Sequence, residues 1–312
     1  MKIAFYTVGW FTGGMENAVY HLGKLLSLDG HKLFAISKVS NAQTEKMENK
    51  MSEYFTFIKY EDGFECDVLI NTSRNEIELP LIKSNKIIHS FYSNLVQNVD
   101  KILPTSKVVC QSKWHYDNLV KLGIKEPLIL GNPLDVDYIL ELSNEKIDEF
   151  SKKDETVYLV VSRISPEKGF RRMIDFMIRH YRENSRLFIV GGVTQERNEN
   201  IKTSLEKGLH QKVVFLGEKE NPYPYIKKAN YILCLSDAEL YGLVSEESHI
   251  LGKQVIFNKY ATAYDQFILG FDSWHDGKLV YLRECDKIDN VEYHKIINKD
   301  RLRKWKEIIE NE

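Results

Sequence analysis

The hydrophobic residues of the chain fall into short runs, separated by amphipathic stretches long enough to form helices. Glu16–Leu28 and Gly169–Tyr181 each carry apolar residues at helical spacing, which predicts two helices. Strands that alternate with helices are typical of parallel α/β units. The short apolar runs predict strands at Lys2–Val8, Lys32–Ser37, Phe55–Tyr60, Asp67–Asn71, Lys86–His89, Val108–Gln111, Leu128–Leu130, Val157–Val161, Arg186–Val190, Val213–Leu216, Tyr231–Leu235 and Gln254–Phe257.

The pattern of strands and helices begins anew after a polar, acidic stretch between residues 135 and 154. A length of 312 residues is sufficient for two domains. We therefore predict an α/β protein with two Rossmann-like parallel-sheet domains, residues 1–135 and 155–312, joined by a linker over residues 136–154. Because ligands bind beyond the carboxyl ends of parallel strands, we expect a site in a cleft where the two domains face each other.

A basic helix is predicted near the C-terminus, over Lys299–Ile309, with apolar residues recurring on one side. We expect this side to pack on a domain, and the helix to return to the N-terminal one. Contact of the basic side with anionic lipid headgroups is the alternative, which would make the protein peripheral at a membrane.

Composition narrows the classes of function. The formal net charge is -2, which does not favour nucleic-acid binding, and no apolar run reaches the length of a membrane span. The first residues lead directly into a predicted strand, so we expect no signal peptide and a cytoplasmic protein. No cysteine belongs to a Cys-x-x-Cys pair, and we expect reduced thiols at Cys66, Cys110, Cys234 and Cys285.

Two glycines, Gly13 and Gly14, follow the first predicted strand and open the first helix. Glycine lets a backbone approach a ligand closely, and a helix N-terminus offers free N–H groups to an anion. Paired glycines at such a place also form simple turns. The pattern alone leaves both an anion site and a turn open.

Two cations follow the first predicted strand of the second half. Arg163 and Lys168 lie five residues apart in a loop with Pro166. A guanidinium binds phosphate oxygens with a planar fork and an ammonium binds them as a point charge, so the pair suits a diphosphate. Two solvated surface charges are the alternative of equal weight.

Two carboxylates flank a glycine loop further along the chain. Glu239 lies at the end of a predicted strand, and Glu247 lies about one turn into a helix that begins near Val244. A carboxylate can accept two hydrogen bonds from a vicinal diol, and the first N–H groups of the helix, those of Leu243 and Val244, favour a phosphate. Spacing alone does not distinguish this site from an ordinary acidic loop.

Taken together, these segments resemble glycosyltransferase family 4, whose members have the GT-B fold of two Rossmann-like domains. The resemblance is densest between Val157 and Ile256, and it combines several motifs in the correct order. The matching segments are Gly13-Gly14-Met15-Glu16 for the Gly-Gly-x-Glu loop, Arg163 and Lys168 for the Arg-x4-Lys pair, Glu239 and Glu247 for the Glu-x7-Glu motif, and Tyr241-Gly242-Leu243 for the usual Phe-Gly-Leu.

The resemblance implies a retaining enzyme of the hexosyl and glycosyltransferase class (EC 2.4), which needs neither a metal nor another cofactor. It implies a nucleoside-diphosphate sugar as donor, with UDP the commonest nucleotide, and a glycan, lipid-linked or protein-linked acceptor, in the synthesis of bacterial surface polysaccharide or glycoconjugate. Arg163, Lys168 and Glu239 would be catalytic residues. Arg163 and Lys168 would bind the diphosphate and stabilise the charge on the leaving group, Glu239 would hold the transferred sugar, and Glu247 would hold the ribose. The rest of the implied donor site is Gly13, Gly14, Gly217, Gly242, Leu243 and Val244.

Acceptors of this family bind mainly on the N-terminal half, which is short in this chain. His89 ends a predicted strand, and relatives often carry a histidine at such a place, facing the transferred sugar. The resemblance therefore implies a catalytic and acceptor-binding role for His89, with a structural histidine as the alternative. Asn71, at the end of the preceding strand, and Glu16 complete the implied acceptor site.

Two other functions stay open. A GT-B epimerase would process a nucleotide sugar without an acceptor, but such enzymes lack the combination of Arg-x4-Lys and Glu-x7-Glu. A degenerate GT-B subunit would bind and support a partner transferase, although the intact motifs argue against it. Asp135-Val136-Asp137 has the form of an Asp-x-Asp metal motif, but its place at the domain junction indicates a helix cap instead.

Overall fold

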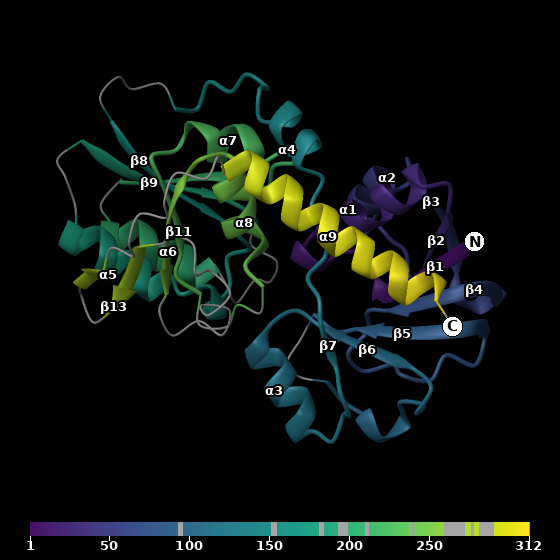
Figure 1. Cartoon of the computed structure of the whole chain (residues 1–312). Coiled ribbons are helices and arrows are strands. Elements are labelled where there is room, and N and C mark those ends of the chain that lie inside the picture. The colour runs from purple at the N-terminus through teal and green to yellow at the C-terminus, as the bar shows by residue number, and fades with distance from the viewer. Residues whose placement is uncertain are drawn as a thin grey trace. The chain divides into compact units, whose positions relative to one another are not determined.

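A computed structural model of the chain divides it into two compact units (Figure 1). Unit 1 consists of Met1–Asp135 and Ile296–Glu312, and unit 2 consists of Val136–Lys295. The described residues are 1–92, 96–150, 155–180, 184–192, 199–209, 212–236, 239, 241–258, 272–275, 278–280 and 290–311.

Unit 1 contains a seven-stranded sheet in the order β3-β2-β1-β4-β5-β6-β7, with every pairing parallel. All predicted strands of the first half are confirmed. Their bounds are β1 Lys2–Gly9, β2 Lys32–Val39, β3 Phe55–Lys59, β4 Phe64–Asn71, β5 Ile82–Ser90, β6 Lys107–Cys110 and β7 Leu128–Ile129. The helices of this unit are α1 Gly14–Leu28, α2 Glu45–Met51, α3 Lys113–Lys121 and most of α9 Asn290–Glu310, with short 3-10 turns at Tyr60–Asp62 and Val99–Lys101.

The C-terminal part of α9 is built into unit 1. Trp305 is fully buried, and its indole N–H donates to the carbonyl of Gly131 at 3.1 Å. Lys86 Nζ donates to the carbonyls of Ile308 and Ile309, both at 3.2 Å. A lysine at a helix C-terminus satisfies carbonyls that have no partner within the helix. The apolar side of α9 therefore packs on this unit.

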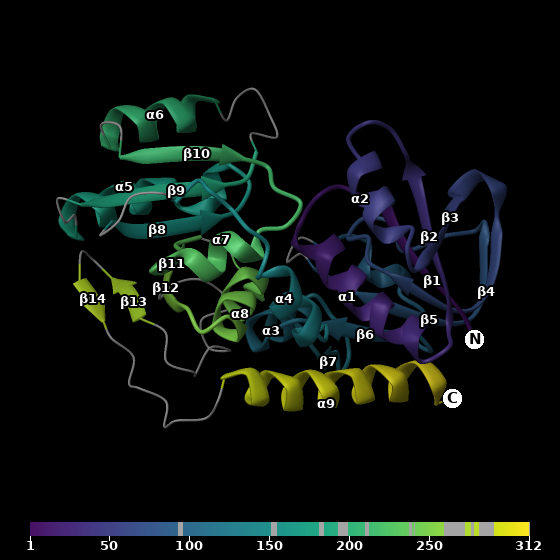
Figure 2. The same ribbon diagram turned by 90° about the horizontal axis from the view of Figure 1, so that it is seen from above.

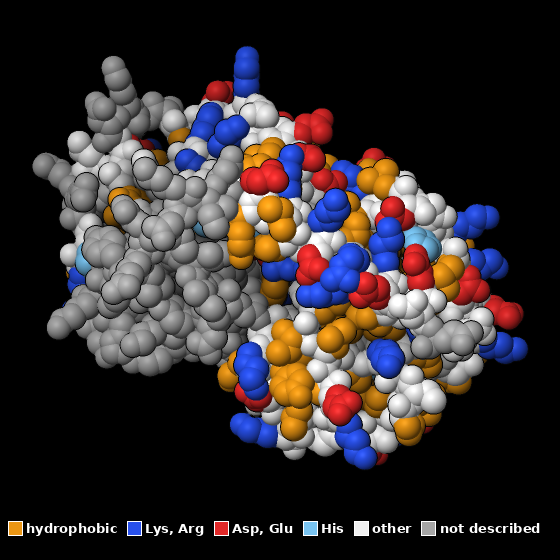
Figure 3. All heavy atoms as spheres, in the orientation of Figure 1, with side chains coloured by type: hydrophobic (Ala, Val, Ile, Leu, Met, Phe, Trp, Pro, Cys, Tyr) orange, Lys and Arg blue, Asp and Glu red, His pale blue; other side chains and the backbone are white. Residues whose placement is uncertain are grey.

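The charged side of α9 forms ion pairs along the helix. Arg303 pairs with Asp300 at 2.6 Å and also with Glu307, and Lys304 pairs with Asp300 at 2.7 Å. On the face shown in Figure 3, Lys and Arg side chains lie interspersed with Asp and Glu side chains. Among the helices of the described residues, none has the length and hydropathy needed to cross a membrane.

Unit 2 repeats the strand order of unit 1, as β10-β9-β8-β11-β12-β13-β14, and only β14 pairs antiparallel. The predicted strands of the second half are confirmed too. The strands are β8 Thr156–Val161, β9 Ser185–Val190, β10 Val213–Gly217, β11 Tyr231–Cys234, β12 Gln254–Asn258, β13 Asp272–His275 and β14 Lys278–Val280. The helices are α4 Val136–Leu142, α5 Phe170–His180, α6 Glu199–Leu209, α7 Tyr223–Lys228 and α8 Leu243–Ile250, with a 3-10 turn at Pro166–Lys168.

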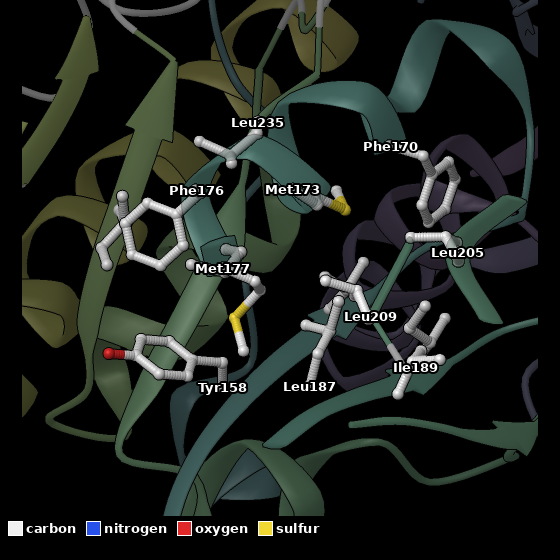
Figure 4. Close-up of a cluster of buried hydrophobic side chains, with 14 of the residues drawn as sticks. Tyr158, Phe170, Met173, Phe176, Met177, Leu187, Ile189, Leu205, Leu209 and Leu235 are labelled. Atoms are coloured by element: carbon white, nitrogen blue, oxygen red, sulfur yellow. The ribbon is translucent and has the colours of Figure 1, made fainter. Parts of the chain in front are cut away.

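Helices α5 and α6 cover one face of this sheet, while α7 and α8 lie on the other (Figure 2). Met173 and Phe176 of α5 and Leu205 of α6 pack on Leu187 and Ile189 of β9 in a buried apolar cluster (Figure 4). The cluster also includes Tyr158 and Val160 of β8 and Ile164 of the loop that follows it. Cys66, Cys110 and Cys234 are free thiols, and Cys285 lies outside the described residues.

Candidate functional site

The candidate site of unit 2 is at the carboxyl ends of β8 and β11. β9 and β10 lie on one side of β8, and β11 and the later strands lie on the other. The switch point of the sheet is therefore between β8 and β11. Open parallel sheets bind ligands at such a point. The loop after β8 carries Arg163 and Lys168, and the residues after β11 lead to Glu239.

Close backbone contact holds these strand ends together. Gly169 has a φ of +74°, and a Cβ built on it would lie 1.9 Å from the carbonyl oxygen of Leu235. Only glycine permits both this conformation and this approach. Gly191 donates its N–H to the carbonyl of Gly217 at 2.8 Å, and Ile164 donates to that of Gly192 at 2.9 Å. The loops after β8, β9, β10 and β11 are thus fixed to one another.

Lys168 and Glu239 form an ion pair across the switch point. Lys168 Nζ lies 3.2 Å from Glu239 Oε2, and the two side chains are 20% and 25% exposed. A partly exposed lysine of this kind is shielded from bulk water on most sides and still reachable by a ligand. The structure therefore brings together a cation and a carboxylate that lie 71 residues apart.

Arg163 does not share this pair. Its side chain is 54% exposed, and its guanidinium lies 3.6 Å from the carboxylate of Glu167, which also accepts a hydrogen bond from Ser165 at 2.6 Å. Burial raises the pKa of Glu167, but the bond from Ser165 and the charges of Arg163 and Lys168 outweigh it, so that the pKa is lowered overall. Glu167 is thus a charged neighbour of Arg163, which the sequence motifs did not single out.

Glu247 lies inside α8, close to the same place. Gly242 caps this helix with a φ of +74°, and Leu243 begins it. Glu247 is buried and accepts a hydrogen bond from the Tyr223 hydroxyl at 3.3 Å. Burial raises the pKa of the Cys234 thiol to about 12, and the charges of Glu239, Lys168 and Glu247 also act on that thiol. These three predicted residues therefore share one neighbourhood around Cys234.

Other predicted donor residues lie at the edge of the same sheet. Val244 is in the first turn of α8, whose first N–H groups have no partner within the helix. Gly217 ends β10 with a φ of +70°, and there is open space where its Cβ would be. Tyr223 was not anticipated, because nothing in its local sequence marks it as a partner of Glu247.

In unit 1, Asn71 ends β4, His89 is the last residue but one of the neighbouring strand β5, and the two residues pair with each other. The Asn71 carbonyl oxygen accepts from the Ser73 N–H at 2.9 Å, so its amide nitrogen faces His89 Nδ1 at 3.3 Å. Burial lowers the pKa of His89 to about 4, which makes the ring neutral near pH 7. Since Nδ1 accepts, the proton is on Nε2, and His89 offers a hydrogen-bond donor there.

At the start of α1, the Glu16 carboxylate lies against Gly13. A Cβ on Gly13 would be 2.6 Å from Glu16 Oε2, whereas Gly14 has open space around it. A carboxylate in the first turn is stabilised by the partial positive charge of a helix N-terminus. Any anion that approaches this end of α1 therefore meets the charge of Glu16.

The Asp-x-Asp sequence at the unit boundary is engaged by lysines. Asp135 pairs with Lys24 at 2.9 Å, and Asp137 pairs with Lys295 at 2.7 Å. Helix α4 begins between the two aspartates, at Val136. Among the described residues, no group of three or more His, Cys, Asp or Glu side chains is arranged to hold a metal ion.

Comparison with known proteins places unit 2 in context. Residues 143–280 match the model of the family described as Glycosyl transferases group 1. No curated protein matches the chain. The match includes both strands of the switch point and the four charged residues of the predicted motifs.

Solved structures resemble the whole chain. A glycosyltransferase from Rickettsia africae ESF-5 aligns with a TM-score of 0.70 at 15% identity, covering 100% of this chain and 99% of that one. HepE of Anabaena in complex with UDP-glucose gives a TM-score of 0.69 at 14% identity, with coverage of 99% and 92%. A TarM mutant of S. aureus, in complex with fondaparinux, alpha-GlcNAc-glycerol and UDP, gives 0.67 at 9%, with coverage of 99% and 100%. The chain therefore has the GT-B fold, and its residues 143–280 match the Glycosyl transferases group 1 family.

Proposed function

We propose that the chain is a retaining, metal-independent glycosyltransferase of family 4, which moves a sugar from a nucleoside-diphosphate sugar, with UDP as the nucleotide, to an acceptor. The observation that carries this proposal is the Lys168–Glu239 pair, 3.2 Å apart at the switch point of the unit that matches the family. A cation and a carboxylate in contact offer complementary partners to a phosphate and to sugar hydroxyls.

The proposed division of labour follows the charges. Lys168 and Arg163 bind the diphosphate and stabilise the charge that develops on the leaving group. Glu239 turns from Lys168 to the hydroxyls of the transferred sugar, while buried Glu247 holds the ribose. The N–H groups of Leu243 and Val244, after Gly242, add donors to the phosphate. Gly217 leaves space for the base.

Unit 1 supplies the acceptor side in this proposal. His89 donates from Nε2 to a hydroxyl of the sugar or acceptor, and Asn71 holds the ring in place. A neutral His89 with a pKa of about 4 is a weak base, so the leaving phosphate accepts the proton of the acceptor. Glu16 binds acceptor hydroxyls, and we assign the backbone of Gly13 and Gly14 to donor binding. We place the enzyme in the cytoplasm, acting on glycan, lipid-linked or protein-linked acceptors of surface polysaccharide or glycoconjugate synthesis.

A donor screen tests this proposal. The protein is incubated with UDP-, GDP- and ADP-sugars and a mixture of acceptors, with and without a chelator, and free nucleoside diphosphate is measured. We expect release from one donor class, unchanged by the chelator. Loss of activity in chelator with recovery in manganese would contradict metal independence. Interconversion of the donor sugar would indicate an epimerase, and binding without release would indicate a supporting subunit.

A further inference from the structure

A second cluster of titratable side chains lies in unit 2, next to the candidate site. The Tyr241 hydroxyl donates to Glu246 Oε2, and Glu246 Oε1 lies 3.4 Å from His294 Nδ1. His294 Nε2 lies 2.7 Å from His249 Nδ1. The four side chains come from the loop before α8, from α8 itself and from the first turns of α9, and none of the four belongs to the proposed donor contacts.

Glu246 and Glu247 are consecutive residues with different partners. Both carboxylates are buried, at 3% and 5% exposure. Successive residues of a helix point about 100° apart, since a turn contains 3.6 residues. Glu247 accordingly contacts Tyr223 of α7, while Glu246 contacts Tyr241 and His294. Helix α8 thus uses one carboxylate for the proposed ribose site and the other for a contact with α9.

The cluster is tightly constrained. A buried carboxylate is costly unless it is paired and hydrogen-bonded, and Glu246 has the hydrogen bond from Tyr241 together with the 3.4 Å approach of His294 Nδ1. His294 is 3% exposed and cannot exchange Glu246 for water. Burial lowers the pKa of His249 to about 4, so this ring is neutral near pH 7 and shares one hydrogen bond with His294. Each member therefore restricts the position of the next.

Tyr241 is the end of the cluster that reaches the proposed site. It directly precedes Gly242, the left-handed residue that caps α8, and Ser245 and Glu246 both donate their N–H groups to the Gly242 carbonyl. The direction of the first N–H groups of α8 depends on how this loop is held. The hydrogen bond from the Tyr241 hydroxyl to Glu246 therefore holds this loop from outside the ligand site.

We propose that Glu246 and His294 are positioning residues for the nucleotide-sugar donor, acting through Tyr241 on the loop that begins α8. This inference rests on the proposed function of the site. It assigns the first turns of α9 to the donor half of the enzyme, although the remainder of that helix packs on unit 1. Their contacts lead to the loop that begins α8, so the expected effect is on donor binding and not on the chemical step.

The test measures binding of UDP, GDP and ADP by calorimetry, and the donor KM and kcat, in matched variants. Tyr241→Phe removes one hydroxyl from a half-buried residue and leaves the packing of the ring unchanged. His294→Leu removes the other partner of Glu246, and Glu246→Gln keeps the shape of the side chain as a conservative variant. Lys295→Ala is the control, because its exposed ion pair with Asp137 is the next contact of α9.

We expect Tyr241→Phe to weaken nucleotide binding and raise the donor KM about tenfold, the worth of one hydrogen bond to a charged group, with kcat nearly unchanged. His294→Leu, which removes a 3.4 Å contact with Glu246, should act in the same direction. Glu246→Gln should retain most of the wild-type nucleotide affinity, and Lys295→Ala should retain all of it. The double variant Tyr241→Phe/His294→Leu should lose little more nucleotide affinity than either single variant, since both substitutions act on the same chain of contacts through Glu246.

Two results would overturn the inference. One is wild-type affinity in Tyr241→Phe, a variant that leaves the buried carboxylate with its histidine. The other is a fall in kcat at constant KM, which would place the cluster in the chemical step. A wild-type protein that binds none of the three nucleotides would instead refute the proposed function, and this inference with it.

Discussion

Near the carboxyl edge of each sheet, two side chains from neighbouring strands or from the loops that follow them form a pair, and the two pairs differ in charge. In unit 2, Lys168 and Glu239 meet at 3.2 Å as an ion pair, partly exposed. In unit 1, Asn71 and His89 meet at 3.3 Å as a buried neutral pair. The strand order is the same in both sheets, but the pairs occupy different neighbouring strands. The ion pair joins the segments after β8 and β11, the counterparts of β1 and β4, while the neutral pair lies on β4 and β5.

The comparison shows how one architecture can present two kinds of polar edge. An ion pair in partial contact with water can exchange its internal contact for a charged ligand such as a diphosphate. A buried neutral pair cannot open without leaving polar groups without partners, but it presents a fixed hydrogen-bond donor whose charge does not change near pH 7. The edge of unit 2 with Lys168 and Glu239 (the ionic edge) suits phosphate, and the edge of unit 1 with Asn71 and His89 (the neutral edge) suits hydroxyl groups.

The largest expected effect is at the ionic edge. Lys168→Ala and Arg163→Ala should each lower kcat by about 10²–10³, because losing one charge-stabilising contact in a shielded site costs roughly 3–4 kcal/mol of barrier. Steady-state kinetics with the donor found in the screen measures this. Arg179→Ala, which removes an exposed pair with Asp175, is the control and should behave as wild type. Near-normal turnover in the Lys168 variant would remove the diphosphate assignment.

The next largest effect is a difference in the free energy of unfolding between glycine variants of the two units. Gly169→Ala should lower the free energy of unfolding by roughly 2–3 kcal/mol, because the residue has a positive φ and its Cβ would lie 1.9 Å from a carbonyl oxygen. Gly14→Ala should change it little, since nothing lies within 4 Å of a Cβ there. Urea unfolding of the two variants gives the comparison. An unchanged free energy of unfolding in Gly169→Ala would mean that the backbone contact between Gly169 and Leu235 is looser than the structure indicates.

The neutral edge should be revealed by pH. An ordinary histidine has a pKa of about 6.5, and that of His89 is lowered to about 4 by burial. Between these values the unfolded chain binds a proton that the folded chain does not, so stability is full above pH 6.5 and is lost as the pH falls toward 4. From pH 7 to pH 4.5 the wild type should lose about 2 kcal/mol more than His89→Asn.

Ring resonances followed by NMR measure the same property directly. The His89 ring should titrate near pH 4. Titration near 6.5 would mean that the ring is solvated and that the contrast between the two edges is smaller than the structure indicates.

The smallest expected effect divides the two glutamates of the ionic edge. Glu247→Ala should weaken binding of UDP itself by about tenfold, since a hydrogen bond to a charged group is lost. Glu239→Ala should leave UDP binding nearly intact and weaken binding of the UDP-sugar. Calorimetry with both ligands distinguishes the two roles, and equal losses in both variants would contradict the assignment.

Much of the fold could be predicted because buried parallel strands are continuous apolar runs. Strands β13 and β14 were not predicted, helix α4 lies in the stretch predicted as a linker, and the predicted strands differ from the observed ones mainly at their starts. β4 begins at Phe64 and β5 at Ile82, both earlier than predicted, because exposed residues such as Glu65 and Lys83 interrupt the apolar run there. Helix α2 carries too few buried residues to produce a periodic signal.

The candidate site was predictable only as far as local motifs extend. The motifs indicated Lys168 and Glu239, but not that they form a pair, since 71 residues separate them. The contact of Glu246 with His294 joins residues 48 apart and has no local pattern in either segment. The same holds for Tyr223 and Glu247. Contacts between distant segments depend on the packing of whole elements, which spacing along a chain does not specify.

The return of α9 to unit 1 has a consequence for biosynthesis. Residues 1–135 leave the ribosome first, yet their unit lacks the buried Trp305 and the Asn298 contact to Leu134 until all of unit 2 has been made. During synthesis, part of the apolar core of the N-terminal segment therefore stays exposed, and exposed apolar surface promotes aggregation. In the cell, the demand for chaperones should fall on the half that is translated first.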